Sequence, residues 1–198
     1  MTARTSDPAS EETRNLAWQS VPQPRPCLIF IGMPGAGKST LASALARRLG
    51  WAYLDTDHLM EAWYGLPLEA LRRTLGREQF LLAEEKTLLS LEVCRCVVAT
   101  GGSAVYSPQA MEALQRSGVI IYLQADFPTI SQRVEQNPER GLVMRSGQNL
   151  HDIYQERCIL YERYADLVVS TASASIQDCI HKLEASIYEL WTSEKNEQ

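Results

Sequence analysis

The 198-residue chain has no long apolar segment: no uninterrupted apolar run is longer than that at 119–123, which is far shorter than the roughly 18 residues that a membrane-spanning helix needs. It also has no surplus of basic residues, because 19 Lys and Arg stand against 24 Asp and Glu and leave a net charge of −5. These two absences argue against a membrane and against nucleic acid as partners. We therefore expect a soluble protein.

Residues 1–26 lack the apolar segment of a secretory signal, and three prolines lie between Val21 and Cys27. We expect this stretch to be a flexible N-terminal arm. The five cysteines are odd in number and include no CxxC pair, which argues against a disulfide framework and against a zinc site. We expect a cytoplasmic protein with reduced thiols, in which Cys94 and Cys96 are buried on a strand.

From residue 27 onward, short β-rich runs alternate with longer helical patterns. This alternation predicts one α/β domain at 27–198, built on a five-stranded parallel sheet with helices on both faces. The predicted strands are 27–31, 51–54, 96–100, 119–123 and 167–170. The predicted helices are 38–49, 57–64, 68–75, 77–93, 108–115, 128–136, 150–164 and 176–190.

One stretch, at 137–149, fits neither pattern. Pro138, Gly141 and Gly147 interrupt it, and Arg140 and Arg145 give it positive charge. We expect this stretch to be a mobile lid.

The most specific motif is GMPGAGKS at 32–39, which fits G-x4-G-K-[ST] and stands between a predicted strand and a predicted helix. Glycines let backbone N–H groups surround phosphate oxygens, and the helix N-terminus favours negative charge. The motif predicts a P-loop NTPase fold that binds ATP, with Lys38 on the β- and γ-phosphates and Ser39 on Mg²⁺. Its nucleotide-binding residues are predicted to be Gly35, Ala36, Gly37, Lys38, Ser39 and Thr40.

P-loops also occur in GTPases and motor ATPases. The chain has no N-K-x-D motif of the kind that reads a guanine base, and it is short for a motor ATPase. A small kinase is therefore favoured.

Two further segments point to an acceptor site. Asp55 and Asp57 follow the second predicted strand, and the third predicted strand runs into Gly101, Gly102 and Ser103. Ligands of open parallel sheets bind where the strands end, so these residues are expected near the P-loop. Two carboxylates at this place can have different roles: one helps to bind Mg²⁺, and the other faces an acceptor hydroxyl.

Taken together, these segments resemble the shikimate kinase family, a nucleoside-monophosphate-kinase-like branch of the P-loop proteins, from about residue 27 to about residue 183. The P-loop, the DTD segment at 55–57, the ATGG strand end at 99–102, the stretch at 76–80 and the LYxxYAD segment at 160–166 follow the family's order and spacing.

The resemblance implies ATP-dependent phosphorylation of a small alcohol under a closing lid. It places Ser39 and Asp55 on Mg²⁺ and Asp57 on the acceptor hydroxyl, which Asp57 would activate. It assigns Arg140 to the γ-phosphate as a catalytic lid arginine beside Lys38. It also places Arg133 near adenine and Arg157 on the carboxylate of the acceptor.

The chain departs from the family pattern at several positions. Where the family reads G-E-x-x-F-R, the chain reads GREQFL at 76–81, so Leu81 replaces the first of two carboxylate-clamping arginines. Ser103 replaces the third glycine of a G-G-G sequence. Gly141 and Ile159 replace prolines. Losing one guanidinium weakens a bidentate carboxylate site, because such pairs are strong and specific in geometry.

These departures lead us to expect a smaller acceptor, L-homoserine, converted to O-phospho-L-homoserine. Its carboxylate would pair with Arg157, its ammonium with Glu84 and its hydroxyl with Asp57, while Leu81 and Ser103 would line the narrowed site. The alternative is shikimate, converted to shikimate 3-phosphate. Also open are a nucleotide or gluconate kinase and a kinase-like binding protein without activity. We expect a monomer.

Overall fold

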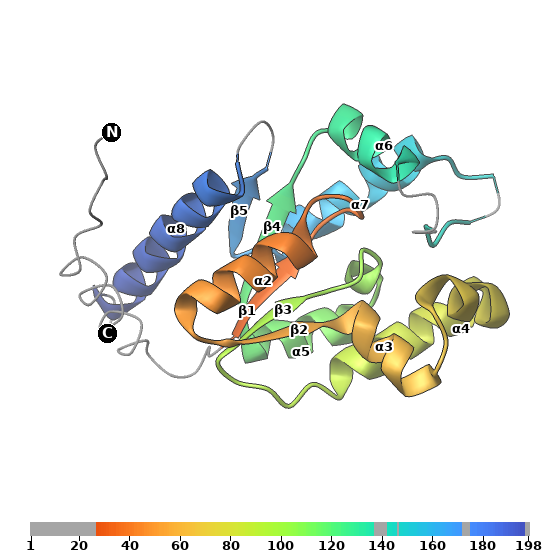
Figure 1. Ribbon diagram of the computed structural model, residues 1–198, viewed down its shortest axis with the longest axis horizontal. Coiled ribbons are helices and arrows are strands. Elements are labelled where there is room, and N and C mark those ends of the chain that lie inside the picture. Colours follow the sequence, from red (N-terminus) through yellow and green to blue (C-terminus); the bar gives the residue numbers. More distant parts are fainter. Residues whose placement is uncertain (1–26, 137–141, 146, 172–174, 197–198) are drawn as a thin grey trace, which may run out of the picture.

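The structure is a computed structural model that describes residues 27–136, 142–145, 147–171 and 175–196 (Figure 1). Five strands form one sheet in the order β2-β3-β1-β4-β5, and every neighbouring pair is parallel. The predicted five-stranded parallel sheet is thereby confirmed. The strands are β1 (Cys27–Ile31), β2 (Ala52–Asp55), β3 (Cys96–Ala99), β4 (Gly118–Gln124) and β5 (Leu167–Ser170).

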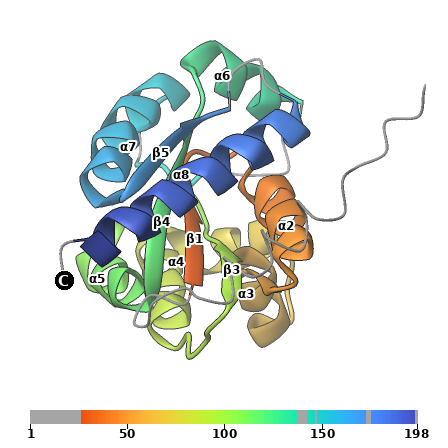
Figure 2. The same ribbon diagram turned by 90° about the vertical axis from the view of Figure 1, so that its left-hand side faces the viewer.

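Helices cover both faces of the sheet. Helices α2 and α8 contact each other and lie on one face, in front of the strands in Figure 2, whereas α5 and α7 pack against β4 on the opposite face. None of the described helices is long and apolar enough to cross a membrane. The helices are α2 (Lys38–Leu49), α3 (Thr56–Tyr64), α4 (Leu68–Leu89), the 3₁₀ turn η1 (Ala104–Tyr106), α5 (Pro108–Ser117), α6 (Phe127–Glu135), α7 (Leu150–Tyr164) and α8 (Ile176–Asn196).

The position of a strand in the sheet explains its composition. All residues of β1 and β3 are buried, and those of β4 are buried up to Gln124, because helices cover these central strands on both sides. The edge strands β2 and β5 each expose two residues. Continuous apolar runs therefore identify the centre of the sheet.

Helix α4 contains the two helical segments predicted from the sequence, and they meet at Gly76. It runs from Leu68 to Leu89 with a kink at Gly76, where φ is 69° and ψ is 175°. This left-handed backbone favours glycine, because a Cβ would strain it. Arg77 therefore begins the second segment of the helix, in a new direction.

The end of α4 also corrects the prediction for the cysteines. The helix stops at Leu89 instead of residue 93, and β3 begins only at Cys96, so Cys94 is exposed in the connecting turn. Arg95 has φ of 50° there and reverses the chain into the strand. Cys96 is buried, as expected.

The topology brings three loops to one edge of the sheet. Strands β2, β3 and β1 are neighbours and run the same way, so their carboxyl ends meet. The P-loop leaves β1, Asp55 ends β2, and the glycines at 101 and 102 follow β3. The predicted arm at 1–26 and Arg140 of the predicted lid lie outside the described residues.

Candidate active site

The P-loop folds around the ammonium group of Lys38. The side chain is buried, and its Nζ donates hydrogen bonds to the carbonyl oxygens of Gly32, at 2.7 Å, and Met33, at 3.0 Å. Gly37 precedes α2 with φ of 96°, which lets the loop turn directly into the helix. A buried cation and a helix N-terminus thus lie together, an arrangement that favours phosphate.

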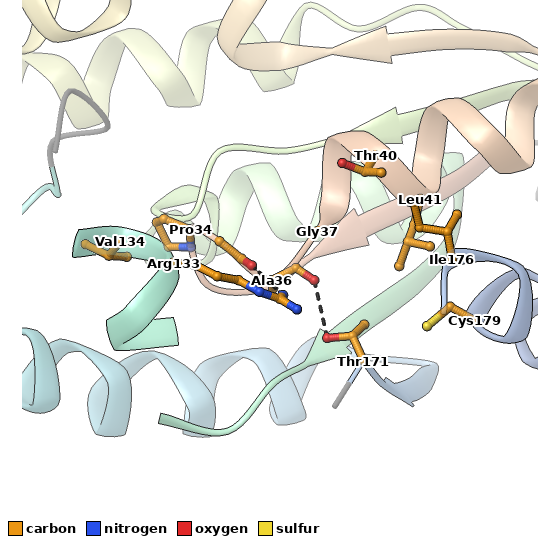
Figure 3. A pocket seen from close by; sticks show the side chains of 11 residues that line it. Pro34, Ala36, Gly37, Thr40, Leu41, Arg133, Val134, Thr171, Ile176 and Cys179 are labelled. Carbon is orange, nitrogen blue, oxygen red and sulfur yellow. Dashed lines mark hydrogen bonds between the residues drawn. The ribbon is translucent and has the colours of Figure 1, made fainter. Parts of the chain in front are cut away.

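A cavity of about 300 Å³ lies beside this loop, between the start of α2 and the start of α8 (Figure 3). One Nη of Arg133 donates a hydrogen bond to the carbonyl oxygen of Gly35 at 2.8 Å, and this bond connects α6 to the P-loop. Leu41 and Ile176 give the cavity apolar walls. Such walls suit the flat face of a nucleotide base. Five predicted nucleotide residues line this cavity: Gly35, Ala36, Gly37, Thr40 and Arg133.

Two oxygen ligands for a cation meet between α2 and β2. The Ser39 hydroxyl donates to Asp55 Oδ2 at 2.7 Å, and the Tyr53 hydroxyl donates to the same oxygen at 3.1 Å. Burial and the nearby carboxylate of Asp55 raise the pKa of Tyr53 to about 12, so this phenol stays protonated as a donor. A hydroxyl and a carboxylate beside a phosphate loop fit the oxygen ligands that Mg²⁺ prefers.

A second cavity, of about 360 Å³, continues from the first, and the two share Pro34, Gly35, Gly37 and Thr40. It runs from the P-loop to the kink region of α4 and to α7, and so joins the phosphate site to the predicted acceptor site. Besides the shared Gly35, Gly37 and Thr40, nine residues predicted from sequence line it: Lys38, Ser39, Asp55, Asp57, Glu84, Gly101, Gly102, Ser103 and Arg157.

Arg157 is a fully buried cation in the lining of this second cavity. It is 1% exposed, and it donates from Nε to the Tyr106 hydroxyl at 3.2 Å and from Nη2 to the carbonyl oxygen of Val143 at 2.9 Å. Among the described residues, no carboxylate forms an ion pair with it. Burying a guanidinium without an anion is costly, so the site is built to receive one.

The two glycines after β3 let side chains from other elements lie close to the backbone. A Cβ on Gly101 would collide with Glu84 Oε1 and lie 2.8 Å from Asp57 Oδ1. A Cβ on Gly102 would lie 2.7 Å from Pro34 and 3.1 Å from Nη1 of Arg157. The acceptor side therefore brings two carboxylates and one guanidinium against a backbone without side chains.

Glu84 is buried deeply enough to change its ionisation. Burial raises its pKa from an ordinary value of 4.5 to about 7. A hydrogen bond from Ser103 and the charges of Arg157 and Lys38 favour the carboxylate, and the charge of Asp57 opposes it. Near neutral pH, Glu84 is thus divided between its acid and its carboxylate form.

The structure does not bring Leu81 to the acceptor cavity. Leu81 lines a neighbouring cavity of about 310 Å³, which shares only Glu84 and Ser103 with the acceptor cavity. It packs beside the apolar cluster that contains Phe80. Its apolar side chain therefore does not narrow the space in front of Arg157.

Sequence reasoning missed three residues here. Arg72 lines the acceptor cavity, Tyr106 accepts a hydrogen bond from Arg157, and Arg77 lies over the ring of Tyr106. The spacing of Arg72 from Glu69 indicates a helical ion pair, and Arg77 stands inside the family segment at 76–81. No pattern pointed to Tyr106.

The shikimate kinase family model matches residues 34–188, which include both cavities. The chain belongs to the shikimate kinase family. The shikimate kinase of Thiobacillus denitrificans is 33% identical over 152 residues, which are 75% of this chain and 83% of the relative. That of Cupriavidus pinatubonensis is 33% identical over 155 residues, 77% of this chain and 81% of the relative.

Solved structures agree with this family. The shikimate kinase of Acinetobacter baumannii in complex with shikimate has a TM-score of 0.76 and 28% identity, and the match covers 91% of this chain and 98% of that chain. Family membership makes the chain an ATP-dependent small-molecule kinase, as predicted. The predicted P-loop kinase fold is also confirmed.

The prediction of homoserine as the acceptor is wrong. The curated relatives are named shikimate kinases and match across about three quarters of the chain, and the structural neighbour holds shikimate. The physical reason lies in Leu81 and Glu84. Leu81 lines a different cavity, and burial, which raises the pKa of Glu84, opposes the carboxylate form that an ammonium group would need.

Proposed function

We propose that this enzyme transfers the γ-phosphoryl group of ATP to the 3-hydroxyl of shikimate. The observation that carries the proposal is Arg157, a buried guanidinium without a carboxylate partner among the described residues, in a cavity that continues from the P-loop. Shikimate has a carboxylate that can pair with this cation and a hydroxyl that can face the γ-phosphate of ATP at the P-loop. The relatives' names support the choice.

On the nucleotide side, the base of ATP would occupy the cavity bounded by Leu41 and Ile176, with Arg133 beside it. The phosphates would lie along the loop at 35–37, within reach of Lys38. Mg²⁺ would be held by Ser39 and Asp55, where it would neutralise phosphate charge. Arg140 is proposed to face the γ-phosphate.

On the acceptor side, Asp57 would accept a hydrogen bond from the reacting hydroxyl and take its proton. The acceptor oxygen then forms a bond to the γ-phosphorus as the bond from that phosphorus to ADP breaks. Lys38 compensates the charge that develops on the transferred group. Most of the catalytic effect comes from alignment and charge, because the protein forms no covalent bond itself.

The test is ADP release by the purified protein with ATP, Mg²⁺ and one acceptor at a time: shikimate, homoserine or gluconate. We expect turnover with shikimate and none above background with the other two. Asp57→Asn should lower kcat for shikimate by about 100-fold or more, as expected for loss of a general base. A wild-type protein that releases no ADP with shikimate would disprove the proposal.

We further propose that the enzyme works in the cytoplasm and as a monomer, as the sequence predicts. One chain supplies all the residues assigned to the two cavities.

A further inference from the structure

Arg77 is a cation without an evident partner beside the acceptor site. Its Nε is buried and has no hydrogen-bond partner in the part of the chain that the structure describes. No described carboxylate forms an ion pair with it. A buried donor of a charged group loses its hydration without compensation, so this position calls for a ligand.

The surroundings of Arg77 connect it to Arg157. The centre of its guanidinium lies 5.8 Å from the centroid of the Tyr106 ring, and that of Arg157 lies 5.1 Å from the same centroid. Two guanidinium groups therefore lie within 6 Å of the centroid of one aromatic ring. Mutual repulsion of two such cations is relieved when an anion lies between them or bridges them.

The other nearby cation cannot serve this purpose. Arg72 lines the acceptor cavity, but Glu69 already holds its guanidinium with hydrogen bonds of 2.7 to 3.0 Å. Its Nη1 donates to the carbonyl oxygen of Leu142 at 2.9 Å. A described carboxylate therefore neutralises Arg72, whereas none of the described carboxylates forms an ion pair with Arg77.

The geometry points to Arg77 as the second carboxylate-binding cation of the acceptor site, acting together with Arg157. This inference rests on the proposed function, since it concerns the carboxylate of the same acceptor. The arginine that the family usually has at position 81 is absent, and Arg77 stands four residues earlier, one helical turn away. The kink at Gly76 begins a new helical segment at Arg77, and its guanidinium lies at the Tyr106 ring.

The test compares Arg77→Gln with wild type on two acceptors, shikimate and its uncharged methyl ester. We expect KM for shikimate to rise by about tenfold or more, because a charge-assisted pair to the carboxylate is lost. KM for ATP should stay the same, and kinetics with the ester should be equal in both proteins. Arg73→Gln is the matched control, because it removes an exposed arginine from the same helix, and it should behave as wild type.

A second variant tests the assignment by rescue. Leu81→Arg, added to Arg77→Gln, should restore a low KM for shikimate, because an arginine is long enough to extend from the cavity of Leu81 past Glu84 and Ser103, which the two cavities share. An unchanged KM for shikimate in Arg77→Gln would overturn the inference and leave the proposed function intact. An equal loss with the ester would also overturn it, because the effect would not depend on the carboxylate. Failure of the wild type to phosphorylate shikimate would instead refute the proposed function.

Discussion

Replacement of Glu84 by glutamine should remove a pH-dependent penalty on folding. The carboxyl group of Glu84 is 2% exposed, and burial raises its pKa from 4.5 to about 7. The charged form is therefore less favourable in the folded protein than in the unfolded chain. This cost is absent below pH 4.5, grows between pH 4.5 and 7, and is complete above pH 7.

The magnitude follows from the difference between the two pKa values. Each pKa unit corresponds to about 1.4 kcal/mol, so ionising Glu84 costs about 3 kcal/mol of the free energy of unfolding above pH 7. Glutamine has nearly the same shape and stays neutral, so it avoids this cost. The stability of Glu84→Gln relative to wild type should therefore increase by about 3 kcal/mol as the pH rises through this window.

Urea unfolding at a series of pH values between 5 and 8 measures this difference directly. Glu78→Gln, on the exposed surface of the same helix, controls for loss of an acidic residue at α4. Asp57, Arg157 and Lys38 also act on Glu84, but both proteins contain them, and Ser103 can still donate to the amide oxygen. A stability difference that does not change with pH would refute the reasoning.

The remaining predictions concern catalysis. Lys38→Met should abolish phosphoryl transfer and leave the circular dichroism spectrum unchanged, since this ammonium lies inside the loop that binds phosphate; normal turnover would exclude the assigned phosphate site. Gly102→Ala should raise KM for shikimate more than KM for ATP, because the new methyl group presses on Pro34 and Arg157; equal effects on both substrates would contradict this. Arg157→Ala should lower kcat/KM for shikimate through loss of the carboxylate pair, by a factor that corresponds to about 2 kcal/mol or more of transition-state stabilisation. Kinetics close to wild type would show that the carboxylate binds elsewhere.

The sheet and the phosphate site could be predicted because they depend on local patterns. A central strand covered on both faces has to be apolar throughout, and β1, β3 and β4 show this directly in the sequence. The spacing of glycines before Lys38 is likewise set by the loop itself. The break at Gly76 in α4 could be predicted as well, because a single glycine decides the backbone there, whereas the end of this helix could not: it stops at Leu89 instead of residue 93.

The acceptor site could be predicted only in part. Their spacing in the sequence places Leu81 and Glu84 on one face of a helix. In the structure, however, Glu84 lines both the acceptor cavity and its neighbour, whereas Leu81 lines the neighbouring cavity alone. The contribution of Tyr106 depends on how η1 packs against α4 and α7, contacts that are distant in sequence. Such long-range packing leaves no periodic signal in the chain.

The backbone at residues 142 and 143 links the two arginines of the acceptor cavity. The carbonyl oxygen of Leu142 accepts from Arg72, and that of the next residue, Val143, accepts from Arg157. A shift of this short segment would change the environment of both guanidinium groups at once. Substitutions at Arg72 and Arg157 should therefore be non-additive: the energetic effect of one will depend on whether the other is present. A change of acceptor specificity made at one of these two positions would therefore depend on the residue at the other.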